Sequence, residues 1–366
     1  MNLRGHYPIQ FSKLSTYRAE LYGFSAIWIL IFHLLIWKVF PQGAISSVAL
    51  RHFILLGNTG VDIFLILSGI SLYFAMQKRR TMSDYFGRRL SRLMPTFIIL
   101  YIGIWTYQLI NSGNIPQYLI RLSGLALWFE GNKMSTWYVS AILVFYVLYP
   151  YIYSWLFENN RGFIFPRWCL LLILSLVIFW AMHKLNFEYF KLVEIALGRI
   201  PSFLIGCLLG KWVYENKTIK YVWKLPIVIV AIAFYILRNP EAQWRWWTRL
   251  LYPVGGLLIL LAFTVLLSTV DNHRKKREKK DNHPIRVFLR KSGDLSLELY
   301  LGSAAILEVC RETGVPFLTF APSDNVWVRA GISVAFIAAT YVVAFLAHAC
   351  IDALGSLKQR HARKLA

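Results

Sequence analysis

Two ionisable residues lie deep within strongly apolar segments, where a charge is costly unless it serves a purpose. His33 stands within SAIWILIFHLLIW, and Asp62 stands within GNTGVDIFLILSG, the next apolar segment. An imidazole titrates near neutral pH, and a carboxylate that orients it makes it a better general base. We therefore expect His33 and Asp62 to be catalytic. The alternatives are a neutral histidine hydrogen-bonded across helices and a purely structural His–Asp pair.

The positions of His33 and Asp62 predict similar depths. If the first helix enters near Leu21 and the second leaves near Gln77 at the same face, His33 lies about 18 Å and Asp62 about 22 Å from that face. Consecutive antiparallel helices are usually neighbours. The two side chains are therefore expected to meet.

Basic residues crowd the segment between the second and third apolar runs. Within RRLSRLMP, the i, i+3 and i, i+4 spacings place Arg92 on a shared helix face with Arg89 and Arg88. Guanidinium groups bind phosphate oxygens in a bidentate manner. This pattern favours a cytosolic ligand that carries phosphate, although a role in membrane topology alone would also explain the charges.

Aromatic side chains gather where the chain is expected to leave the membrane on the opposite side. WRWWTR (244–249) is one such group, and Trp137 and Tyr138 within STWYVS form another. Aromatic belts occur at membrane interfaces without any ligand. Trp137 and Tyr138 are therefore either part of such a belt or candidates for stacking against a sugar acceptor.

The elements that position these residues are predicted to be membrane helices. The 366 residues are 57% hydrophobic and 16% charged, against about 45–50% and about 25% in soluble proteins. Runs of about 20 apolar residues predict ten spanning helices. Their expected limits are 21–39, 52–77, 94–111, 136–157, 168–184, 196–214, 224–238, 248–270, 295–312 and 327–350. We expect one all-α membrane-embedded domain over 1–366 with no soluble domain, and residues 117–129 as an interfacial or re-entrant segment.

The net charge of +22 is interpreted as an orientation signal. Most of the 40 Lys and Arg residues fall in the N-terminal tail and in loops after even-numbered helices, which predicts that both termini are cytoplasmic. The basic run 273–283 has no domain around it that could form a nucleic-acid site, so no nucleic acid is expected as a partner. Anionic lipid headgroups remain a partner that this charge suits.

The four cysteines are predicted to be packing residues. Cys169, Cys207, Cys310 and Cys350 are isolated from one another and have no histidine at zinc spacing. No metal and no tightly bound cofactor are therefore expected.

Six segments in this order resemble the acyltransferase-three family of integral membrane acyltransferases. They are ELYGFSAIWILIFH, GNTGVDIFLILSG, RRLSRLMP, STWYVSAILVFYVLYP, GRIPSFLIGCLLG and SGDLSLELYL. The resemblance implies a ten-helix bundle in the cytoplasmic membrane that takes an acyl group, commonly acetyl, from cytosolic acyl-CoA as co-substrate. It further implies transfer to a hydroxyl of a surface glycan or related acceptor such as a lipid-linked sugar.

Residue by residue, the resemblance assigns the family's histidine to His33, its aspartate to Asp62 and its arginine pair to Arg89 and Arg92. The implied mechanism has the arginines hold CoA phosphates, while His33 acts as the base for the acceptor hydroxyl or relays the acyl group.

The sequence departs from the family pattern at two places. The family arginine about ten residues before the histidine is replaced by Gly23 or its neighbours, and Arg18 is the nearest basic residue. The histidine after the SLxLYL motif is replaced by Gly302 and Ser303. We expect the long side chain of Arg18 to reach toward the cytosolic mouth. A glycan or lipid-linked sugar transporter, and a catalytically degenerate partner subunit, are the alternative functions.

Overall fold

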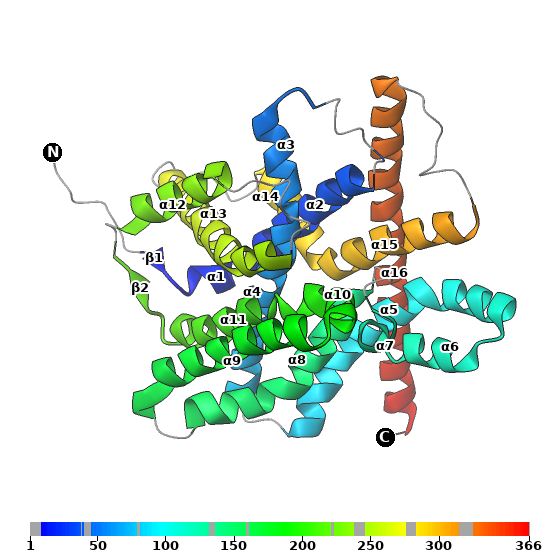
Figure 1. The fold of residues 1–366 in the computed structure, drawn as a ribbon, viewed down its shortest axis with the longest axis horizontal. Coiled ribbons are helices and arrows are strands. Elements are labelled where there is room, and N and C mark those ends of the chain that lie inside the picture. Colours follow the sequence, from blue (N-terminus) through cyan, green and yellow to red (C-terminus); the bar gives the residue numbers. More distant parts are fainter. Residues whose placement is uncertain are drawn as a thin grey trace.

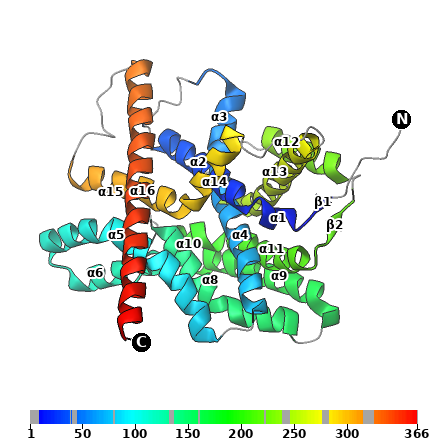
Figure 2. The same cartoon turned by 180° about the vertical axis from the view of Figure 1, so that it is seen from behind.

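The computed structural model describes residues 9–37, 39, 45–78, 81–131, 136–158, 161–220, 223–237, 246–275, 283–314 and 325–365. Within these ranges the fold is helical, except for an antiparallel pair of two-residue strands, β1 (Ile9–Gln10) and β2 (Thr218–Ile219). The helices assemble into a bundle with the long C-terminal helix α16 along one side (Figure 1). The view from behind shows α14 and α2 near α4 (Figure 2).

The helices follow the apolar segments of the sequence, with short helices between them. They are α1 (Lys13–Thr16), α2 (Arg18–Ile36), α3 (Val48–Leu55), α4 (Gly60–Gln77), α5 (Met82–Ser112), α6 (Ile115–Leu122), α7 (Ala126–Glu130), α8 (Trp137–Tyr153), α9 (Ile164–Leu185), α10 (Phe187–Leu197), α11 (Ile200–Tyr214), α12 (Lys224–Leu237), α13 (Tyr252–Lys275), α14 (Pro284–Asp294), α15 (Ser296–Glu312) and α16 (Val326–Leu365). A 3-10 turn, η2 (Leu56–Thr59), joins α3 to α4.

Eight helical stretches within the described residues are long and apolar enough to cross a membrane. They are Arg18–Ile36, Val48–Gln77, Met82–Ser112, Trp137–Glu158, Ile164–Leu185, Phe187–Tyr214, Arg249–His273 and Val326–Ser356. The prediction of an all-α, multi-pass membrane protein is therefore confirmed. The expected count of ten spanning helices and the cytoplasmic position of both termini stay predictions.

Two of the ten expected spans fall short of that length. The range 224–238 contains only a shorter apolar helix, Lys224–Ala233. The range 295–312 corresponds to α15, which has 17 residues and carries Glu298, Glu308 and Arg311. Residues 117–129 cover most of α6 and most of α7. Both helices are far too short to span a bilayer.

Helix α5 begins well before the range 94–111 that hydropathy predicted. Thr81 caps it, because its hydroxyl accepts a hydrogen bond from the Asp84 backbone N–H at 3.1 Å. The helix continues through Pro95. The arginines of RRLSRLMP therefore project from a continuous helix, which the scan missed because its first turns are polar.

Glycines let two pairs of helices approach closely, as small residues do in membranes. A Cβ on Gly69 of α4 would lie 2.7 Å from the Cys207 backbone nitrogen of α11, and a Cβ on Gly206 would lie 2.3 Å from the Ile66 carbonyl oxygen. Cys207 is buried at this crossing, and all four cysteines are free thiols.

Gly23 of α2 forms the second close contact, with α14. A Cβ there would lie 1.9 Å from the Leu289 carbonyl oxygen, and a Cβ on Gly293 would lie 1.9 Å from the Ala19 carbonyl oxygen. Arg286 and Arg290 of α14 also pair with the buried Glu20 at 2.9 and 2.8 Å. Helix α14 is thereby held against the first turns of α2.

Candidate active site

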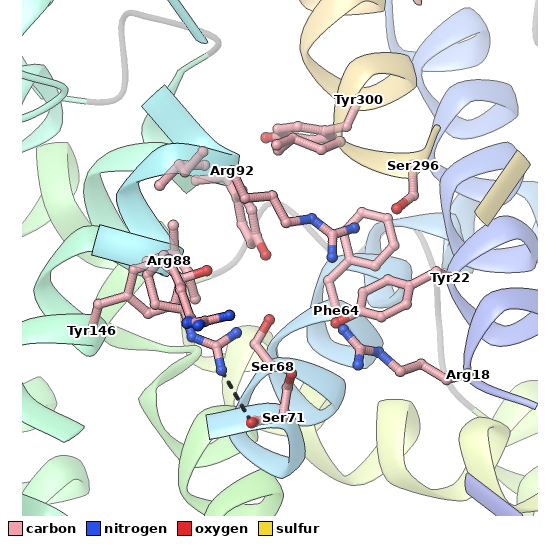
Figure 3. A pocket seen from close by; sticks show the side chains of 15 residues that line it. Arg18, Tyr22, Phe64, Ser68, Ser71, Arg88, Arg92, Tyr146, Ser296 and Tyr300 are labelled. Atoms are coloured by element: carbon pink, nitrogen blue, oxygen red, sulfur yellow. Dashed lines mark hydrogen bonds between the residues drawn. The ribbon is translucent and has the colours of Figure 1, made fainter. Parts of the chain in front are cut away.

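Four arginines from two helices line a pair of adjoining cavities. Arg18 of α2 and Arg88, Arg89 and Arg92 of α5 border both of them. The cavities have empty volumes of about 700 and 1220 Å³. Figure 3 shows Arg88 and Arg92 approaching the smaller cavity from α5, while Arg18 approaches from α2. The structure thus brings together all four arginines that the sequence singled out.

These guanidinium groups have no acidic partner in the part of the chain that the structure describes. Arg89 donates from Nη2 to the Ser71 carbonyl oxygen of α4 at 3.2 Å, and Arg18 lies 5.5 Å from the centre of the Tyr22 ring. Four cations that share one space without carboxylates repel one another, so the arrangement favours a bound anion.

Aromatic rings line the inner end of the smaller cavity. Tyr138 and Tyr300 pack edge to face with ring centres 5.4 Å apart, and Phe64 lies 6.2 Å from Tyr138. Tyr22 lies 5.5 Å from Phe64. Arginine side chains and aromatic rings therefore line the same cavity (Figure 3).

His33 lies near Tyr300 but does not border the cavity. Its ring stacks on Trp37 with centres 4.0 Å apart and an interplanar angle of 16°, and it lies 6.4 Å from the Tyr300 ring. Among the described residues, the buried Nδ1 atom of His33 has no hydrogen-bond partner. Tyr300 borders the cavity and is also a neighbour of the imidazole.

Asp62 binds a different set of residues from the one that the sequence suggested. Its Oδ1 accepts a hydrogen bond from the Ser202 hydroxyl at 2.6 Å, and its Oδ2 lies 3.5 Å from Nε of Arg199. The expected hydrogen bond between His33 Nδ1 and Asp62 is absent. Depth along the helices was not enough to predict this contact, because it does not determine which way each side chain turns.

Arg199 is the residue that the sequence reasoning missed. It is fully buried, and its Nη2 donates to the Asn58 side-chain oxygen at 2.5 Å and to the Asn58 carbonyl at 3.2 Å. Its guanidinium also lies 4.9 Å from the Trp137 ring and 5.6 Å from the Tyr252 ring. An arginine inside an otherwise apolar stretch was the signal, since an intramembrane charge requires a partner.

Trp137 and Tyr138 pack edge to face with ring centres 6.1 Å apart but have different further neighbours. Trp137 packs on Arg199, whereas Tyr138 borders the arginine cavity, and both rings are buried. The side chains of residues 244–248 lie outside the described residues, so the aromatic surface expected at WRWWTR is not placed. Among the residues that the structure describes, no three His, Cys, Asp or Glu side chains gather as metal ligands would.

The helices and these cavities define a multi-pass membrane protein with a cavity lined by arginines, near a histidine of a candidate membrane helix. Residues 22–349 match the family of acyltransferase domains called Acyl_transf_3. The chain belongs to that family, which confirms the resemblance drawn from its motifs.

Two relatives illustrate the similarity. The chain is 22% identical over 295 residues to the protein named "Putative O-acetyltransferase SACOL0978" from Staphylococcus aureus (strain COL), covering 69% of this chain and 46% of the relative. It is 24% identical over 260 residues to O-acetyltransferase OatA from Staphylococcus aureus (strain NCTC 8325 / PS 47), covering 59% of this chain and 41% of the relative. The chain thus spans less than half the length of these curated relatives. No solved structure matches it.

Proposed function

We propose that this protein is a membrane O-acyltransferase that uses acyl-CoA, with acetyl-CoA as the expected donor. The observation that carries the proposal is the arginine cavity, in which Arg18, Arg88, Arg89 and Arg92 converge without a carboxylate partner among the described residues. CoA carries phosphates at one end and a thioester at the other, which suits adjoining cavities lined by arginines and by aromatic and aliphatic side chains. Family membership and relatives named as O-acetyltransferases support the same class of reaction.

The two cavities suggest how the donor lies. The larger one is bordered by apolar residues of α4, including Leu67, Ile70 and Phe74, and suits the nucleotide. The phosphates then lie among the arginines, where guanidinium groups form bidentate contacts. The pantetheine arm enters the smaller cavity, which places the thioester beside Tyr138 and Tyr300.

His33 is proposed to act on the far side of Tyr300. With Nδ1 buried and unbonded, its imidazole has capacity to take the proton from an acceptor hydroxyl as the thioester is attacked, or to carry the acyl group itself. In either case the thiolate of CoA leaves on the arginine side. Asp62 contributes through Arg199 and Ser202 instead of through His33.

The acceptor is proposed to be a hydroxyl of a surface glycan or of a lipid-linked sugar, reached from the side of the membrane opposite the arginines. The cytoplasmic membrane is then the proposed location, because acyl-CoA is cytosolic and the acceptor is exported. Lipids surround the bundle, and O-acetylation during polysaccharide biosynthesis is the expected process.

The test is incubation of the purified full chain in vesicles with acetyl-CoA labelled in the acetyl group. Transfer of label to an added glycan, or release of free CoA thiol, supports the proposal. Movement of glycan across the vesicle without acyl chemistry would instead identify a transporter. If the protein neither binds acetyl-CoA nor turns it over, it is a degenerate partner subunit. Mass spectrometry of surface glycans from cells with and without the protein then identifies the acceptor.

A further inference from the structure

The inner wall of the smaller cavity is an aromatic pair contributed by two helices. Tyr138 of α8 and Tyr300 of α15 meet edge to face, with an interplanar angle of 67° and ring centres 5.4 Å apart. Only 7% of Tyr138 and 4% of Tyr300 is exposed. Both rings therefore form part of the cavity lining that the arginines also border.

Further rings hold this wall in place from both sides. Phe64 of α4 packs against Tyr138, and the His33 ring of α2 lies 6.4 Å from the Tyr300 ring. Tyr138 also packs edge to face against Trp137, which in turn contacts the buried Arg199. Because rings packed in this way have little room to rotate, they hold their places in the cavity lining.

Arginines line the same cavity as the two rings. Arg89 is tethered to the Ser71 carbonyl of α4, so its guanidinium has a defined position relative to the wall. A donor whose phosphates are held by arginines has its thioester held at a set distance along the cavity. The acyl chain beyond the thioester must then fit between that point and the two tyrosine rings.

We propose that Tyr138 and Tyr300 set the length of the acyl group that the protein accepts, and that this length is short, of acetyl size. The inference rests on the proposed function, because it assumes that acyl-CoA lies in the arginine cavity. A hydrophobic pocket discriminates roughly 10–200-fold for each methylene that does or does not fit. A packed aromatic wall penalises a longer chain, since added methylenes would force the rings out of their places.

The experiment compares acetyl-, butyryl- and octanoyl-CoA on the purified full chain. Non-hydrolysable thioether analogues of the three donors give Kd values, so the readout does not depend on turnover, and free thiol release gives kcat/KM. The variants are Tyr138→Ala and Tyr300→Ala, with Tyr138→Leu and Tyr300→Leu where an alanine variant fails to fold. Matched controls are Tyr138→Phe and Tyr300→Phe, which keep the rings, and Tyr149→Leu, which removes a buried ring of α8 that does not border the cavity.

Wild type is expected to prefer the acetyl analogue over the octanoyl analogue by at least tenfold in Kd. Truncation at either wall position is expected to reduce this preference tenfold or more, while the phenylalanine variants and Tyr149→Leu keep it. Equal affinity of wild type for acetyl and octanoyl donors overturns the inference while leaving the acyl-CoA site intact. If folded truncation variants keep the wild-type preference for the acetyl analogue, the inference is also overturned and the acyl-CoA site is again left intact. Absence of binding of every acyl-CoA analogue by wild type overturns the proposed function itself.

Discussion

Asp62 of α4 and Arg199, which directly precedes α11, form an ion pair within the bundle, with 3.5 Å between Oδ2 and Nε and no solvent exposure on either side chain. Burying two charges is costly, and the cost is recovered only if further hydrogen bonds satisfy the remaining atoms. Ser202 and Asn58 supply those bonds at 2.6 and 2.5 Å. The pair therefore joins α4, η2 and α11 at one point, beside the aromatic residues that separate it from the arginine cavity.

Substitution of one partner of this pair should destabilise the protein strongly. In Arg199→Gln the carboxylate of Asp62 loses its cation, and in Asp62→Asn the guanidinium loses its anion. Removal of one member of a buried pair costs about 3–5 kcal/mol. The expected result is a lower midpoint of thermal unfolding for both single variants in detergent, together with reduced acyl transfer.

The double variant Asp62→Asn with Arg199→Gln distinguishes a pair from two independent positions. Because neither charge is then left alone, its loss of stability should be smaller than the sum of the single losses. A loss of stability in the double variant equal to the sum of the two single losses would contradict the pairing. Lys191→Gln provides a control, since Lys191 pairs with Glu188 at the surface, where such pairs contribute about 0–1 kcal/mol.

His33→Ala should abolish acyl transfer while leaving the fold intact. Nδ1 of His33 makes no hydrogen bond, so its removal breaks no polar contact at that atom and loses mainly the stacking on Trp37. A general base contributes roughly 10²–10⁴-fold to the rate. Turnover of acetyl-CoA to the acceptor is the measurement, with the unfolding midpoint recorded alongside. Activity above a tenth of wild type would show that His33 is structural.

The sequence predicted the grouping of the four arginines better than the contacts of the buried polar residues. The arginines were predictable because their i, i+3 and i, i+4 spacings define a helix face whatever the surrounding fold. The placement of Arg18 near them followed from its position one turn before the first apolar run. These inferences depend only on local geometry.

The partner of Asp62 could not be predicted in the same way. Arg199 lies far from it in sequence, and the two meet because Gly69 and Gly206 bring α4 and α11 into close contact. The divergence of Trp137 and Tyr138 also depends on which helices flank α8. Contacts of this kind follow from the packing of several helices, which hydropathy and spacing do not encode.

Arg92→Gln and Arg89→Gln should weaken binding of acyl-CoA. A hydrogen bond to a charged group is worth about 1.5–3 kcal/mol, so each loss should raise the Kd for acetyl-CoA roughly tenfold or more. Lysine at either position should restore the charge but not the bidentate geometry, and therefore only part of the affinity. Binding of a thioether analogue measured by calorimetry is the check.

Arg121→Gln is the matched control for these variants. Arg121 is already paired with Glu130 at 2.8 Å and borders neither arginine cavity. Its substitution should leave the Kd for acetyl-CoA unchanged. If Arg89→Gln and Arg92→Gln behave like Arg121→Gln, these arginines determine topology only.

Arg18→Ala should reduce acyl-CoA affinity about as much as Arg92→Gln does. Arg18 borders both cavities, and its guanidinium lies over the Tyr22 ring on the side of α2 that faces α5. Lys13→Ala provides the comparison, because Lys13 lies over the Tyr17 ring and borders neither cavity. Equal Kd values for wild type and Arg18→Ala would exclude Arg18 from the donor site.

Gly23→Arg should prevent correct assembly instead of restoring the arginine that the family carries near this position. Even a single Cβ at residue 23 would lie 1.9 Å from the Leu289 carbonyl oxygen and 2.9 Å from the Gly293 nitrogen, both of them backbone atoms of α14. Since a helix backbone cannot yield locally as a flexible side chain can, α2 and α14 would have to separate. That movement would also strain the pairing of Glu20 with Arg286 and Arg290.

The alanine variants make the test quantitative. Gly23→Ala should lower the unfolding midpoint and the monodisperse fraction on size exclusion, whereas Gly103→Ala in α5, where a Cβ meets nothing within 4 Å, should leave both nearly unchanged. An active, monodisperse Gly23→Arg protein would show that α14 is not packed against α2 as described. Loss of assembly in Gly23→Ala and Gly23→Arg, together with weaker acyl-CoA binding in Arg18→Ala, would mean that α2 contributes its cation to the donor site from Arg18, because residue 23 is occupied by the helix crossing.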